Sequence, residues 1–188
     1  MKDRLVKGTS LVGVVRLLRS QLRTRKLPEL GPWEQDLLRK RVAPSTWYAL
    51  EVFDSLLQYA HRYVFDGSEL AAQNMGRVFA KELFASRSGD GRREGEPPLE
   101  RLANLGARWR KLFNFGEFSV TPWPAADSRH GAKIQIAGYP DMSACHGHAI
   151  IGWSLQLVED AGAKDVVVRV EERPWMHNSV LTYSLTWS

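Results

Sequence analysis

Apolar residues recur every three or four positions along the first two thirds of the chain, which is the spacing of one face of an α-helix. Thr9 or Ser10 is suited to cap the first helix, and Pro32 to open a short second one. The first helix is expected to bury Leu11, Val14, Val15, Leu18 and Leu22. The chain is therefore predicted to begin with two helices.

Three further helices are predicted in the middle of the chain. The first has Ser45 or Thr46 as its N-cap, and a turn at residues 66–68 leads into the second. The third covers residues 99–113 and is closed by Gly116. Their expected inward positions are Leu50, Phe53, Leu57, Ala60 and Val64, then Ala72, Met75, Phe79 and Leu83, then Leu102, Leu105, Trp109 and Leu112.

The apolar spacing then changes to strict alternation, the period of a β-strand. Strands are expected over residues 117–123, 132–139, 166–173 and 180–187. A helix that begins at Asp141 or Ser143 and ends at Gly162 separates the second strand from the third. The order ββαββ is typical of an antiparallel sheet with helices on one face. The predicted fold class is α+β, with N-terminal helices packed on a C-terminal four-stranded antiparallel sheet.

Composition indicates one globular domain over residues 1–188, because 44% of the residues are hydrophobic and 25% are charged. Residues 86–98 contain no large apolar side chain, so they are predicted to form a mobile surface loop. The single thiol, Cys145, excludes an internal disulfide and favours a reducing compartment. No apolar run is long enough to span a bilayer, so a cytoplasmic protein is expected.

The positive charge is concentrated near the N-terminus. Residues 1–43 contain eleven Lys or Arg and four Asp or Glu, while the net charge of the whole chain is +5. Such a patch suits an acidic protein partner, an anionic membrane or nucleic acid. No aromatic residues alternate with these charges for base stacking, which argues against nucleic acid. The simpler interpretation is a solvated helix face whose last turn, with Arg23, Arg25 and Lys26, complements the helix dipole.

Several short stretches resemble a paralogous family of myxobacterial proteins. They are Val6-Lys7-Gly8-Thr9, Pro44-Ser45-Thr46-Trp47-Tyr48, Trp109-Arg110, Gly152-Trp153, the run from Gly162 to Val166, and Trp187. That family in turn is similar to the superfamily of the 4-vinyl reductase domain, the heme–nitric-oxide-binding domain and the TRAPP tethering subunits. The resemblance implies helices on a four-stranded antiparallel sheet, ligand sensing or scaffolding, and frequent dimers.

The chain departs from these relatives at two places. Related domains often have a glycine and a cysteine in the turn before the last strand, whereas residues 173–179 contain neither. The heme-binding branch has a Tyr-x-Ser-x-Arg clamp, and the nearest stretch, Tyr183-Ser184-Leu185-Thr186, does not match it. The sequence therefore gives no support for heme, and no cofactor is predicted.

Cys145 and His148 form the sharpest polar cluster. Three residues apart on a helix, they would share one face and supply two zinc ligands, but no second pair stands at a recognised spacing. A Cys–His nucleophilic pair is the other chemical interpretation, because a helix N-terminus lowers a thiol pKa. A packed thiol beside partly exposed histidines explains the pattern more simply, so no enzyme activity is predicted.

The large aromatic residues suggest a pocket between the helices and the sheet. Its expected lining is Trp109, Trp153, Tyr183 and Trp187, although residues at such spacing are more often plain core. In the last strand, Thr182, Ser184 and Thr186 alternate with the large residues and are predicted to form an interface. A homodimer is the simplest closed assembly.

The sequence thus predicts a non-enzymatic signalling module that binds a small apolar ligand or a protein partner. Two alternatives stay open: a dimeric scaffold or assembly protein, and a zinc-binding protein centred on Cys145 and His148.

Overall fold

The computed structural model describes residues 3–85, 95–124, 129–139 and 141–188, with only the backbone described at 83–85. The expectation for Leu83 and most of the predicted loop at 86–98 lie outside this description. The elements are β1 (Leu5–Lys7), α1 (Gly8–Thr24), α2 (Pro32–Arg39), β2 (Trp47–Ala49), α3 (Leu50–Tyr63), α4 (Glu69–Ala85), α5 (Pro98–Leu112), β3 (Glu117–Pro122), β4 (His130–Ala137), α6 (Ala144–Asp160), β5 (Val167–Glu172), a 3₁₀ turn (Pro174–Met176) and β6 (Leu181–Trp187).

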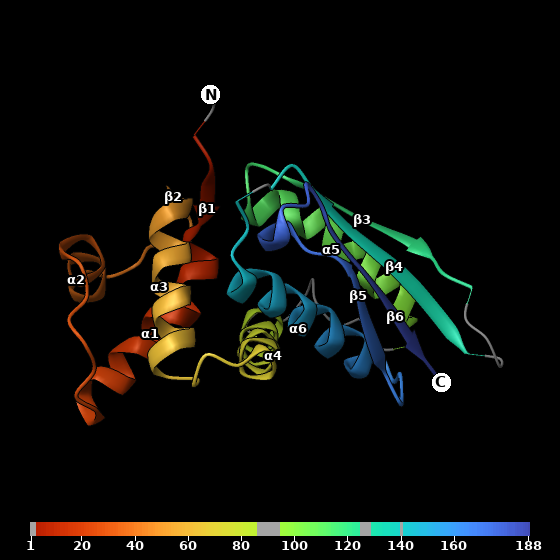
Figure 1. Ribbon diagram of the computed structural model, residues 1–188, viewed down its shortest axis with the longest axis horizontal. Coiled ribbons are helices and arrows are strands. Elements are labelled where there is room, and N and C mark those ends of the chain that lie inside the picture. Colours follow the sequence, from red (N-terminus) through yellow and green to blue (C-terminus); the bar gives the residue numbers. More distant parts are fainter. Residues whose placement is uncertain (1–2, 86–94, 125–128, 140) are drawn as a thin grey trace.

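The predicted α+β fold is confirmed. The four C-terminal strands form an antiparallel sheet in the order β3-β4-β6-β5. Helices α5 and α6 cover one face of this sheet, and α1, α2 and α3 form the opposite end of the molecule (Figure 1). The large residues of β6 point toward the helices, because Leu181, Tyr183 and Leu185 are fully buried. Among the described residues, no helix has both the length and the hydropathy needed to cross a bilayer.

Two helix starts and one helix end differ from the predictions. Helix α1 begins at Gly8, before Thr9, because the chain enters it directly from β1. Ser45 and Thr46 lie in a turn, and β2 pairs with β1 before α3 begins at Leu50. Helix α5 ends at Leu112 with Phe113 as its C-cap, while Gly116, at φ +69°, lies in the turn before β3. Strands β1 and β2 were not predicted, because three residues are too few to show the alternation that identifies a strand.

Helix α6 is the centre of the fold. Fourteen of its seventeen residues are buried, and Ser143 caps it by accepting a hydrogen bond from the backbone N–H of His146. A Cβ placed on Gly152 would lie 2.0 Å from the Gln73 carbonyl oxygen, and one on Gly76 would lie 2.0 Å from that of Ala149. These two glycines therefore let α4 and α6 pack backbone to backbone.

Candidate functional site

The four aromatic residues predicted to line a pocket all lie in the core. Trp109 donates its indole N–H to the Phe115 carbonyl at 3.0 Å, and the Tyr183 hydroxyl bonds Ser154 at 2.7 Å. Trp153 and Trp187 are also buried. None of the four lines either of the hollows described below. A ligand among these side chains would have to open the core, and the pocket predicted for them stays a prediction.

Part of that interior is an aromatic cluster built around Phe113. Its ring lies 4.2 Å from the Trp109 ring and between 5.8 and 6.4 Å from the rings of Phe53, Phe115 and His146. These partners come from α3, α5, α6 and the chain leading into β3. The cluster therefore joins the N-terminal helices to the sheet-bearing part through close ring packing.

His146 and Tyr139 form the polar centre of this cluster. The Tyr139 hydroxyl and His146 Nδ1 share a hydrogen bond of 2.9 Å. Full burial lowers the pKa of His146 to about 4, and the charge of Asp54 opposes this only in part. Burial likewise raises the pKa of Tyr139. Both side chains are therefore neutral at pH 7, and each is already partnered.

Cys145 and His148 point at different neighbours. The Cys145 thiol donates to the Leu57 carbonyl on α3 at 3.5 Å, and burial raises its pKa to about 12. His148 faces α4, with Nδ1 3.4 Å from the Gln73 amide and Nε2 3.4 Å from a Glu69 carboxylate oxygen. Over the described ranges, no three His, Cys, Asp or Glu side chains gather as metal ligands. The thiol is thus protonated, which is the unreactive form.

The hydroxyl face of β6 lies beneath longer side chains. Lys133 on β4 and Glu171 on β5 form an ion pair of 2.9 Å across β6, which lies between them in the sheet. Thr182 is buried and donates to a Glu172 carboxylate oxygen, and Ser184 is also buried. Of the predicted interface residues, only Thr186 is half-buried and the other two are buried. A partner that binds this face would therefore also contact the ion pair of Lys133 and Glu171.

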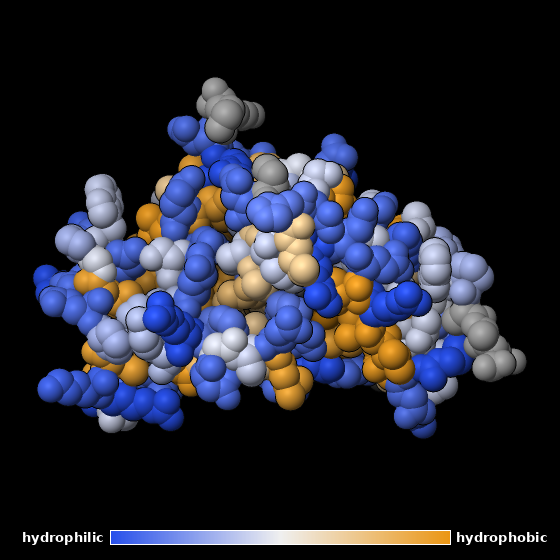
Figure 2. Space-filling model, viewed as in Figure 1, coloured by the Kyte–Doolittle hydropathy of each residue, from blue (hydrophilic) through white to orange (hydrophobic). Residues whose placement is uncertain are grey.

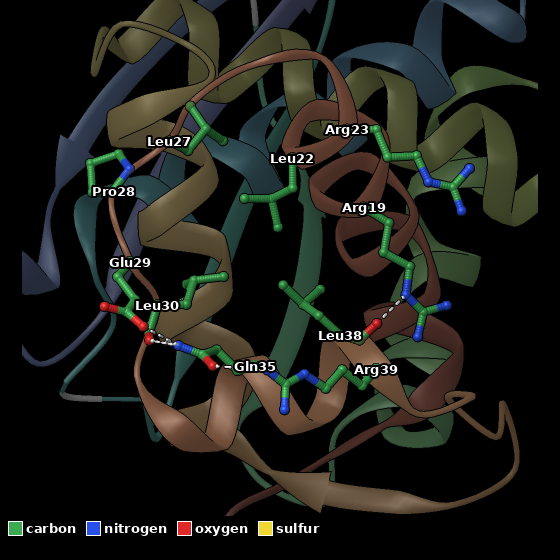
Figure 3. Close-up of a pocket in the computed structure, with 10 residues that line it drawn as sticks. All are labelled: Arg19, Leu22, Arg23, Leu27, Pro28, Glu29, Leu30, Gln35, Leu38 and Arg39. Atoms are coloured by element: carbon green, nitrogen blue, oxygen red, sulfur yellow. Dashed lines mark hydrogen bonds between the residues drawn. The ribbon is translucent and has the colours of Figure 1, made fainter.

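A hollow that the sequence did not indicate lies between α1, α2 and the chain joining them (Figure 3). Its volume is about 720 Å³, and its main lining residues are Arg19, Leu22, Arg23, Leu27, Leu38 and Arg39. Figure 3 shows Leu22 and Leu38 toward its middle, Arg19 and Arg23 on one side, Glu29 on the far side, and Arg39 reaching below toward Gln35. Arg19 donates to the Leu38 carbonyl at 2.7 Å, so it ties α1 to the end of α2. In the sequence, the excess of positive charge near the N-terminus was the one available sign of this hollow. That excess was interpreted as a solvated helix face.

A second hollow, of about 520 Å³, lies between α3 and the start of α6. Its polar groups already have partners: Gln58 and Ser143 both donate to the Asp54 carboxylate, and a His61 ring nitrogen lies 2.9 Å from the Ser68 carbonyl. These side chains have little capacity left to recognise a ligand. The hollow between α1 and α2 is therefore the better candidate site.

Known proteins resemble this chain in structure only. No family model matches the sequence, and no curated protein matches it either. A mutant H-NOX protein of S. oneidensis in the iron(II) state matches with a TM-score of 0.67 and 10% identity, covering 97% of this chain and 96% of that one. The unliganded iron(II) H-NOX protein of K. algicida matches with a TM-score of 0.58 and 13% identity, covering 97% of this chain and 96% of that one.

A third match is an oxygen-binding H-NOX domain related to soluble guanylate cyclases, in its oxygen complex. Its TM-score is 0.60 at 11% identity, and the match covers 97% of this chain and 95% of that one. The chain has an H-NOX-like fold. This confirms the predicted likeness to the heme–nitric-oxide-binding branch at the level of fold.

The fold therefore raises the question of a heme. Heme iron needs an axial side chain such as His, Cys, Met or Tyr facing an open apolar slot. In the aromatic cluster, Tyr139 and His146 bond each other, and rings fill the space around Phe113. The buried face of α5 consists of Arg101, Leu102, Leu105, Trp109 and Leu112, none of which is such a ligand. The described residues of the aromatic cluster and of α5 therefore do not fit a heme.

Proposed function

We propose that this chain is a non-enzymatic signalling module that binds a small ligand in the hollow between α1 and α2. The observation that carries the proposal is the hollow itself, whose volume of about 720 Å³ lies within the usual range for small-molecule sites. Its lining combines four leucines and Pro28 with three arginines, Glu29 and Gln35, so it offers apolar surface and charged groups side by side. One of the H-NOX proteins named above is described in its oxygen complex, so binding of a small ligand has a precedent on this fold.

Helix α1 connects the hollow to the rest of the molecule. On its other side, Gly13 lies so close to α4 that a Cβ there would be 3.0 Å from the Phe79 ring. Arg16 also pairs with Glu82 of α4 at 3.6 Å. Because α4 packs backbone to backbone on α6, a shift of α1 on ligand binding would reach the central helix.

The residues at the hollow support binding more than catalysis. Its lining contains no Ser, Thr, Cys, His or Lys, so it offers neither a common nucleophile nor a histidine base. Cys145, His146 and His148 lie elsewhere and are already hydrogen-bonded. We therefore propose a sensor rather than an enzyme.

A thermal-shift screen with a library of small acids, amines and neutral apolar compounds tests this function. A ligand present at one hundred times its Kd should stabilise the fold by about 2.7 kcal/mol and raise Tm by several degrees. Leu22→Trp, at a side chain that is 39% exposed in the hollow, should abolish the shift by filling the site. Leu70→Trp on α4, where the leucine is 66% exposed, is the matched control and should leave the shift intact. A screen without a hit, or a hit that Leu22→Trp leaves unchanged, would contradict the proposal.

A dimeric scaffold is the second candidate, because the described helices leave the outer face of the sheet uncovered (Figure 1). Sedimentation at micromolar concentration should then show a dimer, and Thr186→Arg should convert it into a folded monomer. A single species near the monomer mass of 21.3 kDa would end this candidate.

A further inference from the structure

We infer that residues 19–41 bind the surface of an anionic phospholipid bilayer, with Trp33 inserted among the headgroups. This segment, here called the basic end, consists of the end of α1, the connecting chain, α2 and the two residues that follow it. The basic end lies at one extremity of the longest axis of the molecule, away from the sheet (Figure 1). Such binding goes beyond the proposed function and needs no ligand in the hollow.

The basic end carries most of the net charge of the chain. Residues 19–41 contain seven Lys or Arg and three Asp or Glu, a balance of +4, while all 188 residues together carry +5. Two of the three carboxylates are already engaged within the fold. Glu34 accepts a hydrogen bond from Ser55, and Asp36 pairs with Lys40 at 2.7 Å. The remaining positive charge faces solvent and would be attracted by a negatively charged surface.

Most cations of the basic end have no acidic partner. The side chains that are exposed and form no ion pair with a described residue are Arg23, Arg25, Lys26, Arg39 and Arg41. These side chains do not converge on one point, since Figure 3 shows Arg23 directed away from the hollow and Arg39 reaching toward Gln35. Cations that are spread in this way suit an extended anionic surface, where each one meets a different headgroup.

Trp33 supplies an apolar anchor on the same end. Its side chain is 78% exposed, which is the highest value among the exposed large hydrophobic residues that the structure describes. Leu22 at the end of α1 is exposed as well. Tryptophan is usually well buried in a folded protein, whereas it is common at the headgroup level of bilayers. Exposed Trp and Leu beside Lys and Arg are typical of segments that lie in the bilayer interface.

An acidic protein is the other partner that this charge would attract. The core of a protein interface is depleted in charged residues, which lie mainly at its rim. In the basic end the two kinds of side chain alternate instead, because Leu22 directly precedes Arg23 and Leu27 directly follows Lys26. Figure 2 likewise shows hydrophobic side chains between strongly hydrophilic ones over α1 and α2. The basic end therefore favours lipid, and an acidic protein is one outcome of the test.

The test is sedimentation of the full chain with vesicles of phosphatidylglycerol and phosphatidylcholine, beside vesicles of phosphatidylcholine alone. The chain should bind the anionic vesicles at least about tenfold more tightly, and high salt should release it, because salt screens exposed charges. Arg25→Gln combined with Lys26→Gln should weaken this binding at least about tenfold. The matched control is Arg110→Gln combined with Lys111→Gln, an exposed Arg-Lys pair in the last turn of α5. It should change the affinity less than twofold.

Quenching of tryptophan fluorescence tests the insertion of Trp33. Anionic vesicles with brominated acyl chains should quench part of the fluorescence of the chain, and Trp33→Phe should remove this quenching. Trp123, which is 39% exposed, lies directly after β3, and that strand ends far from α1 and α2 (Figure 1). Trp123→Phe should therefore leave the quenching intact.

Four results would overturn the assignment of a lipid surface to the basic end. They are no sedimentation with anionic vesicles, equal binding to neutral vesicles, equal weakening by the two Arg-Lys pairs, and quenching that survives Trp33→Phe. Release of the chain from anionic vesicles by an equal charge of soluble poly-glutamate would also overturn it, and would indicate an acidic protein as the partner.

Discussion

Helices α6 and α2 are opposites in how they are held. Fourteen of the seventeen residues of α6 are buried, whereas none of the eight residues of α2 is. Helix α6 touches α4 through the backbones at Gly76 and Gly152. Helix α2 packs only its half-buried Leu37 and Leu38 on the core and is otherwise held by side-chain hydrogen bonds, chiefly from Arg19 to its last carbonyls.

This difference places the main source of stability and the candidate site in different parts of the chain. Buried apolar area is the main source of folding free energy, so α6 and its neighbours carry most of the stability. An element held by a few hydrogen bonds opens locally at much lower free energy than the whole fold. The candidate site lies beside the loosely held helix, where a ligand can change the structure without unfolding the core.

The largest effect is expected from Gly152→Ala. The new Cβ would meet the Gln73 carbonyl oxygen at 2.0 Å, so α4 and α6 must separate. We expect a loss of about 3 kcal/mol or more in the free energy of unfolding, or no soluble protein. Urea denaturation measures the loss, and Val78→Ala on the exposed face of α4 is the control. A loss below about 1 kcal/mol would show that the two helices are not locked together.

Leucine truncation compares the two helices directly. Leu155→Ala in α6 should cost about 3 kcal/mol, because it leaves a cavity in a fully packed region. Leu37→Ala in α2 should cost about 1 kcal/mol, since that side chain is only half-buried and its site can collapse. Equal losses in urea denaturation would remove the distinction between α6 and α2.

Lowering the pH should reduce the free energy of unfolding through protonation of His146 on α6. Its folded pKa of about 4 lies below the unfolded value of 6.5, so the unfolded state binds more protons between these values. Stability is then lost as pH falls through this window, by about 2 kcal/mol between pH 7.5 and pH 5. His146→Asn, which retains a polar group for Tyr139, should remove most of this dependence, and His177→Asn should not. A wild-type stability that is flat over this range would contradict the assignment.

The smallest effect is expected from Arg19→Gln. It removes the hydrogen bonds to the end of α2 and should cost about 1 kcal/mol. Amide hydrogen exchange should accelerate about fivefold in α2 and stay unchanged in α6. Arg16→Gln, at an exposed position on the same helix, is the control. Faster exchange in both α2 and α6 would mean that they open together.

The sequence predicted those parts of the fold that depend on local patterns. Pro32 correctly marks the start of α2, and Ser143, one of the two predicted starts, is the N-cap of α6. The large residues that alternate along β6 lie on the face that meets the helices. The pairing of β1 with β2 was missed, because each strand has three residues and pairs across the chain. The backbone contacts at Gly76 and Gly152 depend on which helices meet, and no local pattern reports that.

The candidate site was missed for a similar reason. Leu22 shares α1 with Arg19 and Arg23; the leucine was predicted as core and the basic stretch as a solvated face. Only the return of the chain through Pro28 and α2 leaves Leu22 beside a hollow instead of under a neighbour. The aromatic residues predicted to line a pocket lie in the core, and rings pack closely around Phe113, so that pocket stays a prediction.

The Cys145 thiol provides a way to measure motion between α6 and α3. It is the only cysteine in the chain and donates to Leu57 across the contact between α6 and α3. A thiol with a pKa of about 12 in a buried site reacts with an alkylating reagent only during openings of that contact. The rate at which a reagent alkylates this thiol therefore reports how often the N-terminal helices separate from α6. No engineered cysteine is needed for the measurement.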